Sequence, residues 1–232
     1  MNYNYFYISW AVLYLSIWLL LFTLRKDIRR EMLFVSPLFG LAGIISQAVY
    51  LNDWWKPITL TGTFIGIEDF LIGFSIGGIV AVLYEEIYKK KIKVRKNEPI
   101  IHNKQFYVLF MLPLIFLSGF YIFKINSVYS SFLAFGITSL VIWFRRRDLI
   151  IDSLISGFLF VILGSILYII LTIFFPGFIQ QFWFLPDIWY SKLFLGLPVA
   201  EYIWHFLVGA LIGPLYEFWQ EGRLVNLEKS KK

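Results

Sequence analysis

The sequence contains no cysteine and few charged residues, and each deficit excludes a class of protein. Without cysteine the chain has no disulfide framework, no thiolate metal site and no catalytic thiol. Charged residues make up 16% of the 232 residues, while hydrophobic residues make up 59% and aromatic residues 21%. Soluble proteins have about 25% charged and about 45–50% apolar residues, so a disordered chain, a nucleic-acid-binding domain and nearly every soluble fold are excluded. The phosphate-binding loop, GxGxxG and HExxH motifs are also absent.

What the sequence does have is long apolar runs. A helix that crosses a bilayer needs about 20 mostly apolar residues, and seven segments qualify: 5–24, 32–51, 64–88, 106–123, 127–144, 149–175 and 198–219. The first segment lacks a basic leader and a small-residue cleavage site, so we expect a true span. Together with a mean hydropathy of +0.72, this predicts an all-α integral membrane protein with seven transmembrane helices.

The basic residues predict the orientation of these spans. Of the 21 basic residues, only Lys56, Lys124 and Lys192 fall on the side that would hold the N-terminus. The positive-inside rule therefore predicts a multi-pass protein of the cell membrane with its N-terminus outside and its C-terminus in the cytoplasm. The stretch KKKIKVRKNEP at residues 89–99 is interpreted as a cytoplasmic anchor of this topology, and no nucleic-acid partner is expected.

The sequence also repeats itself. GIEDFLIGFSIGGIVAVLYE at 66–85 aligns without gaps with PVAEYIWHFLVGALIGPLYE at 198–217. Upstream, FTLRKDI at 22–28 resembles VIWFRRRDL at 141–149, with position 25 on 146 and position 27 on 148. We predict a first three-helix unit at 1–88, a basic loop and connecting helix at 89–126, a second unit at 127–219 and a cytoplasmic tail at 220–232. Because four spans separate equivalent helices, the two units should be parallel and related by an axis along the membrane normal.

Small residues recur on the third and seventh spans at the spacing of helix-packing motifs. They are Gly73, Gly77 and Ala81 on one span and Gly209 and Gly213 on the other. Faces of this kind let two helix backbones approach closely. We predict that the two spans meet near the pseudo-axis; the alternative is that each face packs on a helix of its own unit.

Ionisable residues inside spans mark function by default. Glu68 and Asp69 lie near the outer end of the third span, and the repeat places Glu201 at the equivalent point of the seventh. His205 follows Glu201 by four residues and lies on the same helix face. Apolar surroundings favour the neutral form of a carboxyl group, which is the form that a general acid needs. The alternatives are solvated interfacial positions for Glu68 and Asp69 and a buried Glu201–His205 pair.

A second set of acids lies about 16 residues further along, roughly 24 Å in a helix. Glu85, Glu86 and Glu217 fall beside the basic loops, so we expect salt-bridging or orienting residues there and no metal site. Most aromatic residues at span ends are expected to form interfacial belts. Aromatic walls can also line a cavity for a conjugated ligand and stabilise a carbocation.

These features resemble one family. LFLGLPVAEYIWHFLVGALIGPLYEF at 193–218 is similar to the signature helix of the lycopene cyclase domain, which carries Leu-Pro-x-Glu-Glu, then aromatic residues, then Tyr-Glu about 16 positions later. The matching residues are Leu197, Pro198, Glu201, Tyr202, Tyr216 and Glu217, with Glu68, Asp69, Phe70, Tyr84 and Glu85 in the first unit. Gly66 stands where the family has proline, and Ala200 stands where it has the first glutamate.

The resemblance implies a redox-neutral cyclisation of the end groups of lycopene or a related acyclic carotenoid, without a cofactor. A carboxyl group protonates the terminal double bond, an internal double bond closes a six-membered ring, and a base removes a proton. The implied catalytic residues are Glu68, Asp69 and Glu201, supported by His205, Tyr202, Trp204 and Pro198. The implied structural residues are Tyr84, Glu85, Tyr216, Glu217, Gly77 and Gly209.

The expected partners are a lipophilic carotenoid and membrane lipid, and a homo-oligomer is compatible with the sequence. Two other functions stay open: a non-catalytic carotenoid- or isoprenoid-binding protein and a small transporter. The transporter is disfavoured because the middle of the third and seventh spans holds no acid or basic residue. A retinal receptor is disfavoured because the last span has no lysine.

Overall fold

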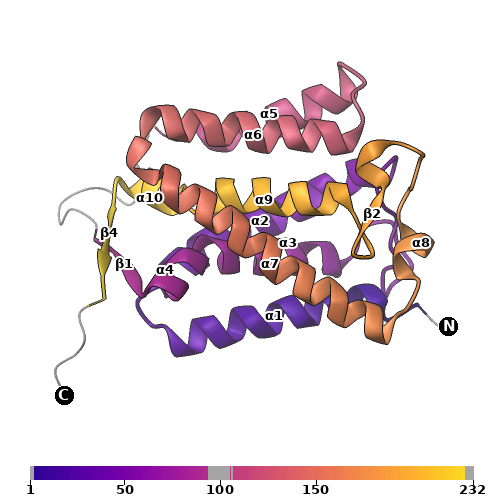
Figure 1. Cartoon of the computed structure of the whole chain (residues 1–232), viewed down its shortest axis with the longest axis horizontal. Coiled ribbons are helices and arrows are strands. Elements are labelled where there is room, and N and C mark those ends of the chain that lie inside the picture. Colours follow the sequence, from indigo (N-terminus) through magenta and orange to yellow (C-terminus); the bar gives the residue numbers. More distant parts are fainter. Residues whose placement is uncertain (1–2, 94–104, 106, 228–232) are drawn as a thin grey trace.

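Long helices run side by side along the long axis of the molecule (Figure 1). The computed structural model describes residues 3–93, 105 and 107–227; residues 94–104, which include part of the basic stretch, and the end of the tail lie outside the described residues. The bundle consists of α1 (Phe6–Leu24), α2 (Arg29–Tyr50), α3 (Ile67–Ala81), α5 (Tyr107–Tyr121), α6 (Ser127–Arg145), α7 (Ile150–Phe174) and α9 (Val199–Ile212). Shorter helices are α4 (Leu83–Tyr88), α8 (Phe178–Phe182) and α10 (Leu215–Gln220).

Two small antiparallel sheets lie at opposite ends of the bundle (Figure 1). At one end β1 (Lys90–Lys93) pairs with β4 (Arg223–Asn226). At the other end β2 (Leu193–Phe194) pairs with β3 (Leu197–Pro198) and leads the chain into α9. The short strands therefore fix the ends of the spans and leave the all-α character of the bundle unchanged.

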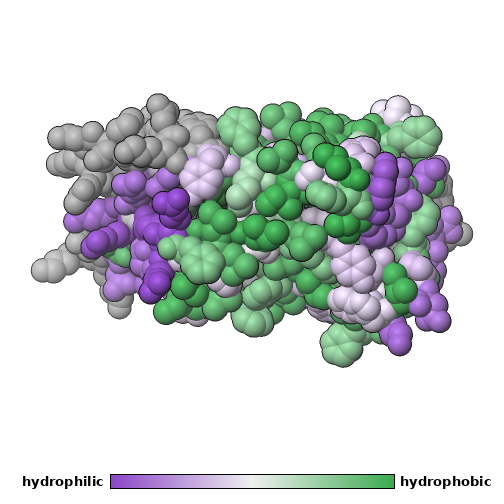
Figure 2. All heavy atoms as spheres, turned by 90° about the horizontal axis from the view of Figure 1, so that it is seen from above, coloured by the Kyte–Doolittle hydropathy of each residue, from purple (hydrophilic) through white to green (hydrophobic). Residues whose placement is uncertain are grey.

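The middle of the surface is apolar, as expected for a protein that crosses a membrane. Figure 2 shows a broad hydrophobic band with hydrophilic residues gathered toward both ends. Large side chains of this band, such as Leu41, Phe158 and Ile162, are more than half exposed. In the described part of the chain six helical segments are long and apolar enough to span a bilayer, and α5 is shorter, at 15 residues. The all-α membrane fold is thus confirmed, whereas the count of seven spans stays a prediction.

Both signature spans are broken near their ends. The segment predicted as 64–88 is divided into α3 and α4 at Val82, and the segment predicted as 198–219 is divided into α9 and α10 at Gly213 and Pro214. Pro214 has no N–H to continue the helical hydrogen bonds. The two breaks fall at repeat-equivalent positions, since the alignment of the signature helices places Val82 on Pro214. Each short helix that follows a break carries one Tyr-Glu pair.

Contacts at the β1–β4 end are reciprocal between the two units. Ile92 of β1 pairs with Leu224 of β4. These two residues occupy the same position in the two repeats when the alignment of the signature helices is continued past residues 85 and 217. The Arg25 guanidinium binds Asp27 through two hydrogen bonds and donates a third, of 3.1 Å, to the carbonyl of Lys90. In the second unit Arg146 binds Asp148 in the same way and donates, at 3.0 Å, to the carbonyl of Gly222. Equivalent residues of the two repeats thus make equivalent contacts at this end of the bundle.

The third and seventh spans meet, but only over a short stretch, and the prediction that their small-residue faces form this contact is wrong. Helix α3 packs along α2, and α9 packs along α7, while α3 and α9 touch only briefly. A Cβ atom on Gly73 would collide with the carbonyl oxygen of Phe39 in α2, and one on Gly77 would lie 2.7 Å from the Cβ of Phe39. A Cβ atom on Gly209 would lie 2.7 Å from the Cα of Gly157 in α7. The small residues therefore serve close packing within each unit, which is the alternative that the sequence left open.

We expect Gly209→Ala to destabilise the folded protein by about 1–3 kcal/mol, because the added methyl group overpacks a backbone contact. Gly136→Ala on α6 is the matched control: a Cβ atom there meets nothing within 4 Å, so stability should stay the same or rise. The thermal unfolding midpoints of the two variants in detergent compare them. Equal midpoints would contradict this prediction, because they would show that the α7–α9 contact can accommodate the added methyl group.

Candidate active site

One cavity of about 480 Å³ lies toward the end of the bundle where α3 and α9 begin. Aromatic side chains from α1, α7, α9 and the segments after α2 and α8 form much of its wall. They include Trp10, Trp54, Trp55, Tyr168, Trp183 and Trp204. Among the described residues that line the cavity, the carboxyl groups are those of Asp69 and Glu201, and lysine and arginine are absent. The two repeat-equivalent acids therefore share one largely apolar chamber.

Glu201 is held by three side-chain donors. Its Oε1 accepts hydrogen bonds from the indole Nε1 of Trp54 at 3.0 Å and of Trp183 at 2.8 Å, and its Oε2 accepts one from the Tyr168 hydroxyl at 2.8 Å. Glu201 is buried in the first turn of α9, where the helix macrodipole favours negative charge. Donors from three different segments thus fix the position of this carboxyl group.

Asp69 is held differently. It lies in the first turn of α3, where one carboxyl oxygen accepts the hydrogen bond of the Tyr7 hydroxyl and the other accepts the backbone N–H of Gly66 at 2.7 Å. This second bond closes the N-terminus of the helix, whose first N–H groups otherwise lack partners. Asp69 therefore both begins α3 and contributes to the cavity wall.

One of the two departures from the family pattern, Gly66, has a local explanation. A proline at position 66 would lack the N–H that binds Asp69, and a Cβ atom there would collide with Oε2 of Glu68. Pro198, at the equivalent position before α9, donates no such bond, and Glu201 is held by side chains instead. Ala200 is buried where the first unit has Glu68. Nothing in the structure explains the alanine at position 200.

Glu68 does not line the cavity, although it is fully buried. Its Oε1 accepts the backbone N–H of Leu60 at 2.6 Å, in the loop that precedes α3. Its other oxygen accepts no hydrogen bond from the described residues. The structure thus places Asp69 and Glu201 in one cavity, whereas Glu68 lies outside the cavity and binds the loop that precedes α3.

His205 lines the cavity but does not touch the carboxyl group of Glu201. Its Nδ1 lies 2.5 Å from the main-chain carbonyl oxygen of Glu201, one turn earlier in α9. The imidazole packs against Gly164 of α7, where a Cβ atom would overlap it, and against the ring of Phe160 at a centroid distance of 4.8 Å. Its Nε2 has no partner among the described residues.

The other supporting residues fall in different places. Trp204 lines the cavity, whereas the Tyr202 hydroxyl donates to the carbonyl of Phe194 in the β2–β3 hairpin, 2.8 Å away. Pro198 is buried at the start of α9. Sequence reasoning missed the residues that bind the acids, because they stand near span ends, where their pattern is that of an interfacial belt. These residues are Tyr7, Trp54, Tyr168 and Trp183.

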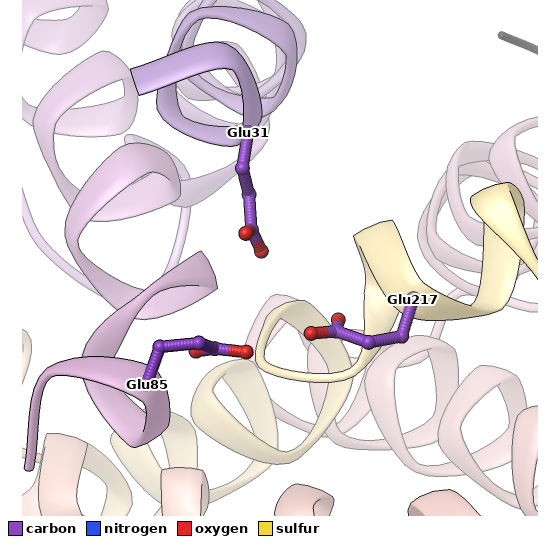
Figure 3. Close-up of side chains that lie close together, drawn as sticks. All are labelled: Glu31, Glu85 and Glu217. Carbon is purple, nitrogen blue, oxygen red and sulfur yellow. The ribbon is translucent and has the colours of Figure 1, made fainter. Parts of the chain in front are cut away.

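The acids at the opposite end of the bundle divide into two kinds. Glu86 forms the expected ion pairs, with Arg25 and Lys89. Glu85 and Glu217 are fully buried and form no ion pair within the described part of the chain, so of the two expected roles only the orienting one stays a prediction for them. Both side chains point toward each other and toward Glu31 of α2 (Figure 3).

The cavity reaches the apolar flank of the molecule between α2 and α5. Leu41 and Ile45 of α2 and Phe110 of α5 belong to its lining, and their side chains are 57%, 49% and 70% exposed. A buried acid pair in an aromatic chamber, open toward the hydrophobic band, defines a multi-pass membrane protein with a site for an apolar molecule.

The comparison with known proteins gives the family. The family model described as "Lycopene cyclase" matches residues 4–87 and 126–219, and the chain belongs to this family. The two matched segments are the tandem units seen in the sequence repeat. No curated protein and no solved structure matches the chain.

Proposed function

We propose that this protein is a membrane carotenoid cyclase that closes a ring at the end group of lycopene or a related acyclic carotenoid. The observation that carries the proposal is the pair of repeat-equivalent acids, Asp69 and Glu201, in one aromatic cavity. A volume of about 480 Å³ lies within the range of about 300–1,000 Å³ of small-molecule sites, which is room for the end group of a long polyene. The remaining chain would leave through the opening between α2 and α5 into the bilayer.

The proposed reaction moves protons and makes one carbon–carbon bond. One carboxyl group gives H⁺ to the terminal double bond, which leaves a tertiary cation. An internal double bond supplies the electron pair that closes the six-membered ring, and a carboxylate removes one proton from the ring cation. The product is an isomer of the substrate, so neither an oxidant nor a reductant is consumed.

The residues that line the cavity can supply the proton donor, the proton acceptor and the stabilisation of the cation that this reaction requires. Asp69 and Glu201 serve as proton donor and acceptor, and the surrounding walls exclude water that would trap the cation. The rings of Trp10, Trp55 and Trp183 pack in contact, with centroids 5.5 Å apart for Trp10–Trp55 and 5.0 Å for Trp55–Trp183. Their faces can stabilise a cation by about 0.5–2 kcal/mol each. Glu68 acts as a positioning residue for the loop before α3.

Expression in a lycopene-accumulating bacterial host tests this function. We expect new monocyclic or bicyclic pigments when the extracted carotenoids are separated by chromatography and identified by absorption. Unchanged lycopene, with the protein present in the membrane, would contradict cyclisation of this substrate. Lycopene that copurifies with the protein but keeps its acyclic ends would favour the binding-only function.

When the protein is induced in deuterated water in cells that already hold unlabelled lycopene, one solvent-derived deuterium is expected in each ring, because the ring closes only after a proton from an exchangeable carboxyl group adds to carbon and the hydrogen then lost is unlabelled. Mass spectra of the cyclised pigment, compared with those of lycopene from the same cells, measure the added label. A product without label beyond that of lycopene would contradict acid initiation.

We further propose seven spans with the β1–β4 end in the cytoplasm. The absence of cysteine makes this directly testable with single-cysteine variants. Lys192→Cys, near the β2–β3 hairpin, is expected to react in intact cells with a thiol reagent that cannot cross membranes. Arg147→Cys is expected to react only after the cells are opened; both native side chains are exposed. Labelling of Arg147→Cys but not of Lys192→Cys in intact cells would show that the protein has the opposite orientation in the membrane.

A further inference from the structure

Three buried carboxyl groups meet at the end of the bundle opposite the aromatic cavity, and a fourth lies near them. Glu31 of α2, Glu85 of α4 and Glu217 of α10 point toward one another, with one oxygen of each within 4.8 Å of the others (Figure 3). Asp152 of α7 lies close enough to interact electrostatically with Glu85. All four side chains are at most 3% exposed. We name these four residues the carboxyl cluster.

The cluster takes two residues from each repeat. Glu85 and Glu217 are equivalent in the alignment of the signature helices. Glu31 and Asp152 are equivalent when the alignment of the upstream segments, which carry the repeated arginine–aspartate pairs, is extended by a few residues. The cluster is therefore reciprocal between the units, like the β1–β4 pairing beside it.

Within the described residues, no lysine or arginine forms an ion pair with the cluster. One oxygen each of Glu31 and Asp152 accepts no hydrogen bond there, and the oxygens of Glu85 and Glu217 have no partner outside the cluster, although these two carboxyl groups interact with each other. Of two arginines at the same end, Arg146 is bound by Asp148, whereas Arg25 is bound by Asp27 and Glu86 and acts on Glu85 only electrostatically. Buried carboxyl groups without a bound cationic partner are costly and call for a counter-charge.

We infer that the carboxyl cluster binds a hard divalent cation of the calcium, manganese or magnesium class. Its donors are all oxygens, which these ions prefer over the nitrogen and sulfur donors that suit zinc and copper. Calcium–oxygen distances of about 2.3–2.6 Å place opposite ligands about 4.6–5.2 Å apart, and one oxygen each of Glu31, Glu85 and Glu217 lies within this span of the others. The bound ion would join α2 and α4 of the first unit to α7 and α10 of the second.

The carboxyl cluster borders an open cleft at the β1–β4 end of the bundle. Asp152 lines this cleft together with Leu149 and Tyr84, and basic side chains, including Lys90, Arg146 and Arg223, line it too. An ion that entered from this end would pass these basic side chains but would not cross the apolar band. The ion site is independent of the cyclase proposal, because it lies at the opposite end of the bundle and is tested by metal content.

The experiment uses the full chain, purified in detergent and incubated separately with Ca²⁺, Mn²⁺ or Mg²⁺. After desalting, elemental mass spectrometry is expected to find about one ion per chain for at least one of them, and a chelator should lower the thermal unfolding midpoint. Glu217→Gln and Asp152→Asn should reduce the affinity at least about tenfold. Glu86→Gln, the same change one residue beyond Glu85, should leave it unaltered.

A wild-type protein that retains none of the three ions, and whose unfolding midpoint responds to neither ion nor chelator, would overturn the inference and leave shared protons as the counter-charge. An equal loss of ion in Glu86→Gln would overturn it too, since binding would then follow net charge rather than the cluster. If Glu217→Gln fails to fold, Asp152→Asn and the wild-type titration decide the question.

Discussion

Replacement of Glu201 by glutamine is expected to abolish ring closure while the protein stays folded in the membrane. Glutamine keeps an oxygen that accepts the Trp54 and Trp183 indole N–H groups, and its amide faces the Tyr168 hydroxyl. The shape and most hydrogen bonds of the site are thereby retained, but the side chain can no longer give or take a proton. Loss of a general acid or base costs about 10²–10⁴-fold in rate.

The measurement is the ratio of cyclised to acyclic pigment in a lycopene-accumulating host, with the membrane content of the protein measured in parallel. Glu86→Gln is the matched control, because it makes the same change at the far end of the bundle and should leave the ratio unaltered. Full cyclisation by Glu201→Gln would remove Glu201 from the mechanism.

The apolar spans and the repeat could be predicted from the sequence because both depend on local composition. The helices that pack against α3 and α9 could not be predicted. Gly77 and Gly209 indicate only that some backbone approaches closely, and the sequence does not say which one. In the structure the neighbour comes from the same unit in each case, Phe39 for Gly77 and Gly157 for Gly209.

The acids were found from the sequence, but the groups that hold them were not. Trp54 and Trp183 reach Glu201 from segments that are distant in the chain, 147 and 18 residues away. Nothing local distinguishes these indoles from belt residues at a membrane surface. Pro214 indicates a break in the seventh span, but the position of Glu217 beside Glu31 and Glu85 depends on contacts between segments that are distant in the chain.

The paired acids of the first unit show where sequence reasoning ends. Glu68 and Asp69 are neighbours and match the family pattern together, so the sequence treats them as equivalent. Successive residues of a helix point about 100° apart. Only Asp69 therefore lines the cavity, while Glu68 binds the N–H of Leu60.

This difference leads to the second large effect. Asp69→Asn is expected to lower cyclisation by about 10²-fold or more, because asparagine can still accept the N–H of Gly66 but cannot transfer a proton. Glu68→Gln is expected to lower it by no more than about tenfold, since the amide oxygen can still accept the N–H of Leu60 and one altered hydrogen bond is worth about 1 kcal/mol.

Pigment ratios of the two variants, normalised to protein in the membrane, separate chemistry from positioning. A change in the apparent affinity for lycopene with turnover retained would assign Asp69 to binding rather than to proton transfer. Equal and severe losses in both variants would return Glu68 to the catalytic set that the family motif implies. A loss confined to Asp69→Asn, beside that of Glu201→Gln, would leave one acid from each unit, so that the two repeat-equivalent helices supply the proton donor and the proton acceptor of a single site.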